Sequence, residues 1–149
     1  MEILNYSLVA LITVLGLICG AAIGFFAKEE LKPGKKYFVG LQKILFTLAV
    51  VLLMYANRAN VHYMWMGGLI LFIYLYHFEK INHVAVYAFF ALVFFLASKT
   101  DLFLPVSASI FLYSLPAGSL IFKNKKETAI CVISFLIIAI ILFFINQKL

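Results

Sequence analysis

The chain has 149 residues, of which 66% are hydrophobic and 12% are charged, and its formal net charge is +6. Soluble domains are about 45–50% apolar and about 25% charged, and a soluble fold of this size has too much surface to hide the excess. The apolar residues form solid blocks of helix length and do not alternate as in the strands of a membrane barrel. Composition therefore predicts an all-α, polytopic membrane helical bundle.

Six apolar runs follow one another along the chain, and residues 1–149 are expected to form one transmembrane domain. A helix that crosses the hydrocarbon core needs about 17–25 residues, so the third and fourth runs are short. Either their flanking residues take part in the crossing, or the two runs form a re-entrant pair. The predicted spans cover residues 3–27, 37–55, 63–78, 84–97, 102–122 and 128–145.

The joints between the spans are short, which predicts six transmembrane helices in three antiparallel hairpins. Lys and Arg indicate the orientation, because they concentrate in cytoplasmic loops. The first, third and fifth joints carry Lys28, Lys32, Lys35, Lys36, Lys80, Lys123, Lys125 and Lys126, and the other side carries Arg58, Lys99 and Lys148. This asymmetry predicts an N-out/C-out protein, most simply of the plasma membrane. It also explains the positive charge without nucleic-acid binding.

The first joint, residues 28–36, is expected to be a loop. Pro33 followed by Gly34 is typical of a tight turn, since proline presets one dihedral and glycine tolerates the next. The loop would crowd carboxylates and lysines at the cytoplasmic surface. Its candidate ligand-binding residues are Glu29, Glu30, Lys35 and Lys36.

Two interpretations of this cluster stay open. The lysines hold a phosphate or an anionic lipid head group, each contributing about 1 kcal/mol at an anionic leaflet. Glu29 or Glu30 would then be placed to act as a general base, with a pKa tuned by the lysines. Alternatively, the cluster is a hydrated loop that sets the topology, because the positive-inside rule already accounts for its lysines.

Lys43 and its neighbour Gln42 are the next candidates for ligand binding. Lys43 is the only charged residue inside a predicted span, about 9 Å along the helix from Tyr37. A charge at this depth is costly unless it is paired, hydrated or extended toward the head groups. A bundle-facing Lys43 would reach Glu29, Glu30, Glu79 or Glu127 from the same side, whereas a lipid-facing one would extend to the membrane surface.

Two spans carry small residues at helical spacing. In the first span, Gly16, Gly20 and Gly24 form two overlapping GxxxG steps, which lets another helix approach closely. That helix belongs to the same chain or to a partner in a homo- or hetero-oligomer. In the fifth span, a face with small and hydroxyl side chains either packs against a neighbour or lines a polar path. Its residues are Ser107, Ser114 and Gly118.

The remaining polar residues indicate no metal site, cofactor or catalytic group. His77, Glu79 and His83 flank the third joint, but their spacing matches no helical pair of metal ligands. Cys19 and Cys131 lie far apart inside apolar runs, which is typical of small buried hydrophobic residues.

Three functions fit these features. The first is a transporter or binding protein for an anionic or amphipathic small molecule or lipid that enters from the basic cytoplasmic collar. The second is a non-catalytic accessory or assembly subunit of a larger membrane complex. It is favoured by the short joints and by the glycine seam, which consists of Gly16, Gly20 and Gly24. The third is a membrane enzyme that acts on lipid head groups. Membrane lipids, and anionic head groups among them, are the expected partners.

Overall fold

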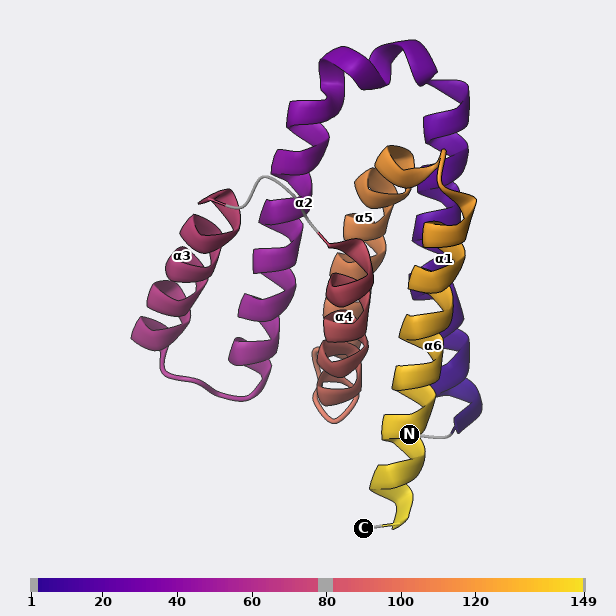
Figure 1. Ribbon diagram of the computed structural model, residues 1–149. Helices are drawn as coiled ribbons and strands as arrows, with labels where there is room; N and C mark the ends of the chain where they lie inside the picture. The colour runs from indigo at the N-terminus through magenta and orange to yellow at the C-terminus, as the bar shows by residue number, and fades with distance from the viewer. Residues whose placement is uncertain (1–2, 78–81, 149) are drawn as a thin grey trace.

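A computed structural model describes residues 3–77 and 82–148, and these residues form α-helices without a strand (Figure 1). The helices follow the six apolar runs, so the all-α prediction is confirmed. Their bounds are α1 Ile3–Phe26, α2 Lys28–Ala56, α3 Val61–His77, α4 His83–Ala97, α5 Phe103–Ile121 and α6 Lys125–Lys148.

Four of these helices are long and apolar enough to cross a membrane, as expected for a membrane-embedded protein. They are α1, the Pro33–Ala56 part of α2, α5, and the Lys125–Asn146 part of α6. The other two helices are shorter: α3 has 17 residues and α4 has 15. At 1.5 Å per residue they extend about 26 and about 23 Å, against a hydrocarbon core of about 30 Å.

The first joint is helical, so the prediction of a loop over residues 28–36 is wrong. The main irregularity is at Ala27, whose N–H still donates to Ile23, and α2 begins at the next residue. Pro33 lies inside α2. Proline removes one N–H donor and bends a helix, but it does not oblige the chain to turn. The start of α2 therefore crosses one end of the bundle before the helix turns alongside its neighbours (Figure 1).

α5 is the central helix, and it packs most extensively against α1 and then against α2. α4 packs chiefly against α6, and α3 chiefly against α2. Consecutive helices alternate in direction (Figure 1). However, α1 and α2 make few contacts with each other, because the crossing segment of α2 holds them apart and α5 lies between them. Pairing as three separate hairpins is thus not confirmed by these contacts.

Glycines make the α1–α5 contact possible. A Cβ on Gly16, Gly20 or Gly24 would lie 2.5, 2.2 or 2.7 Å from a backbone carbonyl oxygen of α5. In the opposite direction, a Cβ on Gly118 would lie 2.2 Å from the carbonyl oxygen of Leu17. No residue with a side chain fits at these distances. The glycine seam of α1 is therefore filled within the chain, and an oligomer through the first span would need another face of α1.

An aromatic cluster fastens α1 to the bundle near the two termini. The ring of Tyr6 lies 5.1 Å from that of Phe94 and 4.6 Å from that of Phe143, centroid to centroid. Its hydroxyl donates a hydrogen bond of 3.0 Å to the carbonyl of Ala139 on α6. Such ring pairs add roughly 0.5–1.5 kcal/mol each beyond the area that they bury.

Candidate functional site

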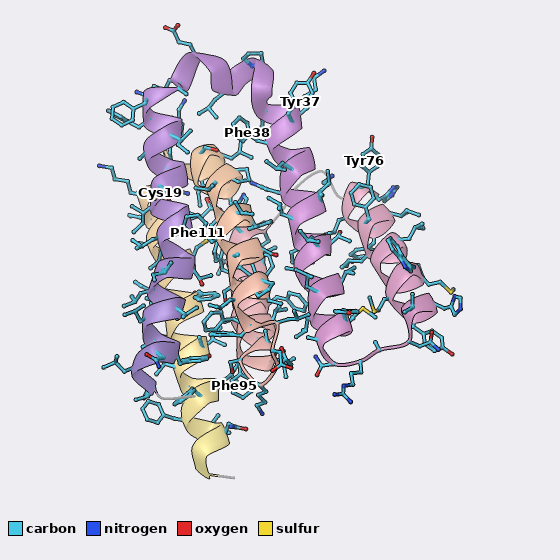
Figure 2. The ribbon with its side chains drawn as sticks, turned by 180° about the vertical axis from the view of Figure 1, so that it is seen from behind. Cys19, Tyr37, Phe38, Tyr76, Phe95 and Phe111 are labelled. Atoms are coloured by element: carbon cyan, nitrogen blue, oxygen red, sulfur yellow. The ribbon has the colours of Figure 1, made fainter. Side chains whose placement is uncertain are left out.

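Most of the described lysines lie toward the end of the bundle where α2 begins and where α5 joins α6, which we call the lysine-rich end. Its described lysines are Lys28, Lys35, Lys36, Lys123, Lys125 and Lys126. Both chain termini lie at the opposite end (Figure 1). Tyr37 of α2 and Tyr76 of α3 are also at the lysine-rich end, where aromatic residues often sit at a membrane surface (Figure 2).

A cavity of about 690 Å³ opens between α2 and α3 at this end, and we call it the α2–α3 cavity. It is lined by Lys35, Lys36, Val39, Gly40, Lys43, Ile44, Phe72 and Tyr76. The α2 residues recur every three or four positions, so they share one face of that helix. Gly40 keeps the middle of this face open, since a Cβ there would meet nothing within 4 Å.

Lys43 lies between α2 and α3, where only 8% of it is exposed. Its Nζ donates a hydrogen bond of 3.3 Å to the carbonyl of Tyr76 and lies 5.2 Å from the centroid of the Tyr76 ring. The described part of α3 ends at His77, so this carbonyl lies in its last described turn, at the negative end of the helix dipole. Lys43 therefore bonds to the last described turn of α3.

The described contacts of Lys43 are all with neutral groups. Within residues 3–77 and 82–148, no carboxylate forms a salt bridge with it. Of the carboxylates expected nearby, Glu79 lies outside the described residues, as does the side chain of Glu30. Among the described residues, the ammonium of Lys43 thus contacts a carbonyl dipole and an aromatic ring and no anionic group.

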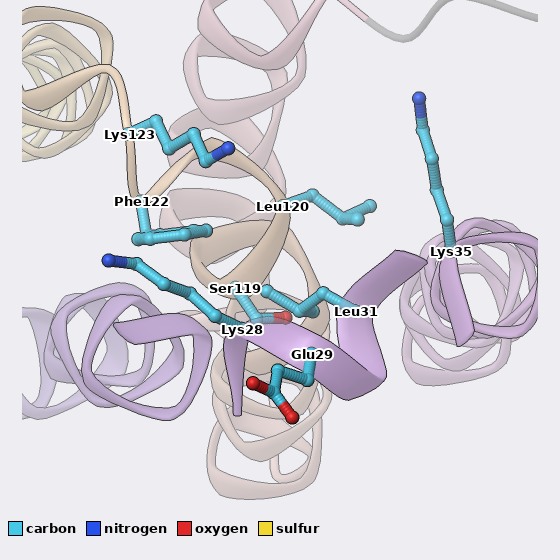
Figure 3. A pocket seen from close by; sticks show the side chains of 8 residues that line it. All are labelled: Lys28, Glu29, Leu31, Lys35, Ser119, Leu120, Phe122 and Lys123. Carbon is cyan, nitrogen blue, oxygen red and sulfur yellow. The ribbon is translucent and has the colours of Figure 1, made fainter. Parts of the chain in front are cut away.

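A second cavity of about 610 Å³ lies under the crossing segment of α2 (Figure 3). It is lined by Lys28, Glu29, Leu31, Lys35, Ser119, Leu120, Phe122 and Lys123. Lys28 has its Nζ 5.1 Å from the ring centroid of Phe25, and Lys123 has its Nζ 5.9 Å from that of Phe122. These lysines are thus placed beside aromatic rings.

Glu29 does not have the surroundings of a general base. Its side chain is exposed and points away from Lys123 (Figure 3). It forms no salt bridge with any side chain that the structure describes. A general base is usually buried or close to a charged partner, and this carboxylate is exposed and has no such partner among the described side chains.

Gln42 faces the interior, away from Lys43. It is fully buried, and neither its Nε2 nor its Oε1 has a hydrogen-bond partner among the described residues. The structure therefore divides the residues that the sequence grouped together. Lys35, Lys36 and Lys43 share the α2–α3 cavity, and Glu29 lines the second cavity together with Lys35.

The serine hydroxyl groups of α5 bond within the protein. Ser107 donates to the carbonyl of Phe103 at 2.7 Å, and Ser114 donates to that of Ile110 at 2.8 Å. Ser114 also accepts a hydrogen bond of 2.7 Å from the hydroxyl of Tyr87. Ser107 and Ser114 are buried at helix contacts, and neither lines the cavities described above.

Sequence reasoning missed five of the eight residues that line the α2–α3 cavity, and Tyr76 and Gly40 are the two that shape the surroundings of Lys43. Tyr76 contributes a carbonyl and a ring, which matter only because α3 folds alongside α2. Gly40 contributes open space, and a glycine three residues before a lysine inside an apolar span is the signal that would have drawn attention to it.

No protein-family model, no curated protein and no solved structure matches this chain. The function is therefore inferred from the chemistry of its own residues.

Proposed function

We propose that this chain is an integral membrane protein that binds an anionic amphiphile in the α2–α3 cavity, with the head group at the lysines and the acyl chain toward the apolar wall. The observation that carries this proposal is Lys43, a buried cation whose described contacts are neutral. A phosphate or carboxylate in the cavity would supply the missing charge.

The lining of the cavity suits both parts of such a molecule. Lys35 and Lys36 stand at its outer edge with Lys43 deeper in, and each cation near an anionic group contributes about 1 kcal/mol. Ile44 and Phe72 offer apolar surface to a chain. A volume of about 690 Å³ also lies in the range of roughly 300–1,000 Å³ that is usual for small-molecule sites.

The proposed topology has six crossings with both termini outside, so the cavity opens to the cytoplasmic leaflet. The eight-to-three distribution of Lys and Arg supports this orientation. Six crossings are supported by α3 and α4, which lie along α2 and α6 as continuous helices. The cytoplasmic leaflet of a plasma membrane carries the anionic lipids that such a cavity would select.

An accessory subunit of a larger complex is the second candidate function. It is favoured by α3, which packs chiefly against α2 and leaves most of its apolar side chains exposed, among them Trp65, Leu69 and Ile73. A partner helix or lipid would cover this surface. A lipid-modifying enzyme has less support, because Glu29 is exposed and without a described partner.

Binding of phosphatidylglycerol to the protein in neutral nanodiscs, measured by native mass spectrometry, tests the proposal. We expect Lys43→Gln to weaken binding about fivefold, the equivalent of about 1 kcal/mol, and Lys43→Arg to retain it. Equal affinities of Lys43→Gln and the wild type would remove the basis of the proposal.

Lys99 provides the matched control. Its Nζ bonds the Asn146 side-chain oxygen at 2.7 Å and lies 4.6 Å from the ring centroid of Phe95, so its contacts are of the same kinds as those of Lys43. Phe95 marks its place at the other end of the bundle from Tyr76 (Figure 2). Lys99→Gln should leave phosphatidylglycerol binding unchanged. Glu79→Gln tests the carboxylate that follows α3, and it too should leave affinity unchanged.

A further inference from the structure

The C-terminus of α2 has a backbone conformation that does not suit its residue. The N–H of Ala59 donates to the carbonyl of Met54 at 3.1 Å, and the N–H of Arg58 donates to that of Tyr55 at 2.9 Å. These two hydrogen bonds form a Schellman motif, which ends a helix with a left-handed residue that is usually glycine. Here that residue is Arg58, with φ 55°, and no other non-glycine residue in the described part of the chain has a positive φ.

The strain at Arg58 points to a use for its side chain. A glycine would end α2 in the same way without the close approach of Cβ to the following carbonyl oxygen. Non-glycine residues in such conformations gather at ligand sites, where the side chain is required in one place in spite of the strain. What lies around the guanidinium therefore decides what Arg58 could bind.

A cavity of about 440 Å³ lies beside this residue, and we call it the Arg58–Asp101 cavity. Its volume is in the range of roughly 300–1,000 Å³ that is usual for small-molecule sites. α2 and α5 pack side by side in opposite directions, so the end of α2 meets the joint that leads into α5, away from the lysine-rich end (Figure 1). The cavity is lined by Tyr55, Ala56, Arg58, Ala59, Val61, Asp101 and Leu102.

Arg58 and Asp101 bring opposite charges to this cavity without pairing. Among residues 3–77 and 82–148, neither side chain forms a hydrogen bond or a salt bridge. Two opposite charges that line one cavity and stay apart leave room between them for a ligand that carries both. The ring of Tyr55 lines the same cavity and is 59% exposed, and an aromatic face attracts a cation.

We propose that the Arg58–Asp101 cavity binds the zwitterionic head group of phosphatidylethanolamine. The planar guanidinium of Arg58 matches two phosphate oxygens, and the carboxylate of Asp101 accepts hydrogen bonds from the primary ammonium. The quaternary ammonium of phosphatidylcholine has no N–H to donate, so that lipid fits less well. Val61 and Leu102 offer apolar surface where the acyl chains begin. This inference does not depend on what occupies the α2–α3 cavity.

Native mass spectrometry of the protein released from phosphatidylcholine nanodiscs that contain minor fractions of phosphatidylethanolamine and phosphatidylglycerol tests the site. We expect the wild type to retain phosphatidylethanolamine in preference to phosphatidylcholine. Arg58→Gln and Asp101→Asn each remove one charge from an exposed side chain, and each should weaken phosphatidylethanolamine binding about fivefold. A wild type that does not prefer phosphatidylethanolamine to phosphatidylcholine would overturn the proposal.

Asp101→Asn separates a zwitterion site from a plain anion site. A site that recognises only phosphate should bind phosphatidylglycerol more tightly once the carboxylate is neutral and should keep its affinity for phosphatidylethanolamine, and this result would also overturn the proposal. Lys99→Gln is the matched control and should change nothing, because it removes a charge that bonds Asn146 outside the cavity. Lys43→Gln should leave phosphatidylethanolamine binding unchanged, so this proposal and the proposed function can fail separately.

Discussion

Gly20→Ala probes the closest approach of α1 and α5. A Cβ on Gly20 would lie 2.2 Å from the carbonyl oxygen of Leu115 and 2.9 Å from its Cα, and both are backbone atoms. Cβ atoms essentially never come closer than 3.0 Å, so the helices must part by at least 0.8 Å, the difference between 3.0 and 2.2 Å. A gap of about 0.5–1 Å forfeits a quarter to a half of the dispersion energy across it.

The expected loss lies at the upper end of the range for overpacking. Such substitutions cost about 1–3 kcal/mol when side chains can adjust, and here two backbones have to move. We therefore expect Gly20→Ala to lower the free energy of unfolding by about 3 kcal/mol. The free energy is measured by titrating the protein from mild detergent into dodecyl sulfate while following helicity by circular dichroism.

Gly40→Ala is the matched control, because the same chemical change occurs where a Cβ meets nothing within 4 Å. Alanine favours a helix over glycine by about 1 kcal/mol, so this variant should be slightly more stable than the wild type. The two substitutions are therefore expected to change the free energy of unfolding in opposite directions. A Gly20→Ala protein as stable as the wild type would refute the close packing of α1 on α5.

Two further predictions concern the joint after α2 and the start of α4. Arg58 has a left-handed backbone (φ 55°), a conformation that strains non-glycine residues by about 1–2 kcal/mol. Arg58→Gly should therefore raise the thermal unfolding midpoint. Asn57→Gly is the control and should not raise it, because φ is −88° at that residue. Burial lowers the pKa of His83 from 6.5, with Glu127 opposing the shift. Below pH 6.5 the unfolded chain then binds more protons than the folded one. The free energy of unfolding therefore has its full value above pH 6.5 and falls as the pH drops from 6.5 to the lowered pKa of His83. Between about pH 8 and about pH 5, His83→Gln should lose less unfolding free energy than the wild type, and parallel losses would contradict this reasoning.

The helices could be predicted from the sequence because each apolar run has the length and uniformity of a buried helix. The start of α2 could not, since Pro33-Gly34 looks the same locally whether the chain turns or a helix bends. The helix that packs on the glycine seam could not be identified from the sequence either. Gly16, Gly20 and Gly24 indicate that another backbone comes close, and only the structure shows that it belongs to α5.

The sequence indicated which residue types belong to the candidate site, but it did not indicate which of these residues lie together. Lys43 stood out because a charge inside a span is rare, but its partner is a carbonyl of α3, which carries no signal in the sequence. Gln42 and Lys43 were considered together because they are neighbours, although adjacent helical residues point about 100° apart. Their separation into two environments follows from the packing of α2 between α3 and α5.

The central position of α5 has a consequence for the synthesis of the protein. Gly118 is about 100 residues downstream of Gly20, and ribosomes add about 5–20 residues per second, so α1 waits roughly 5 to 20 s for the helix that fills its seam. During that time lipid chains or an insertion factor must cover the glycine face. The contact between α1 and α5 therefore forms late in synthesis, and the packing of α6 on α4 and α1 follows it.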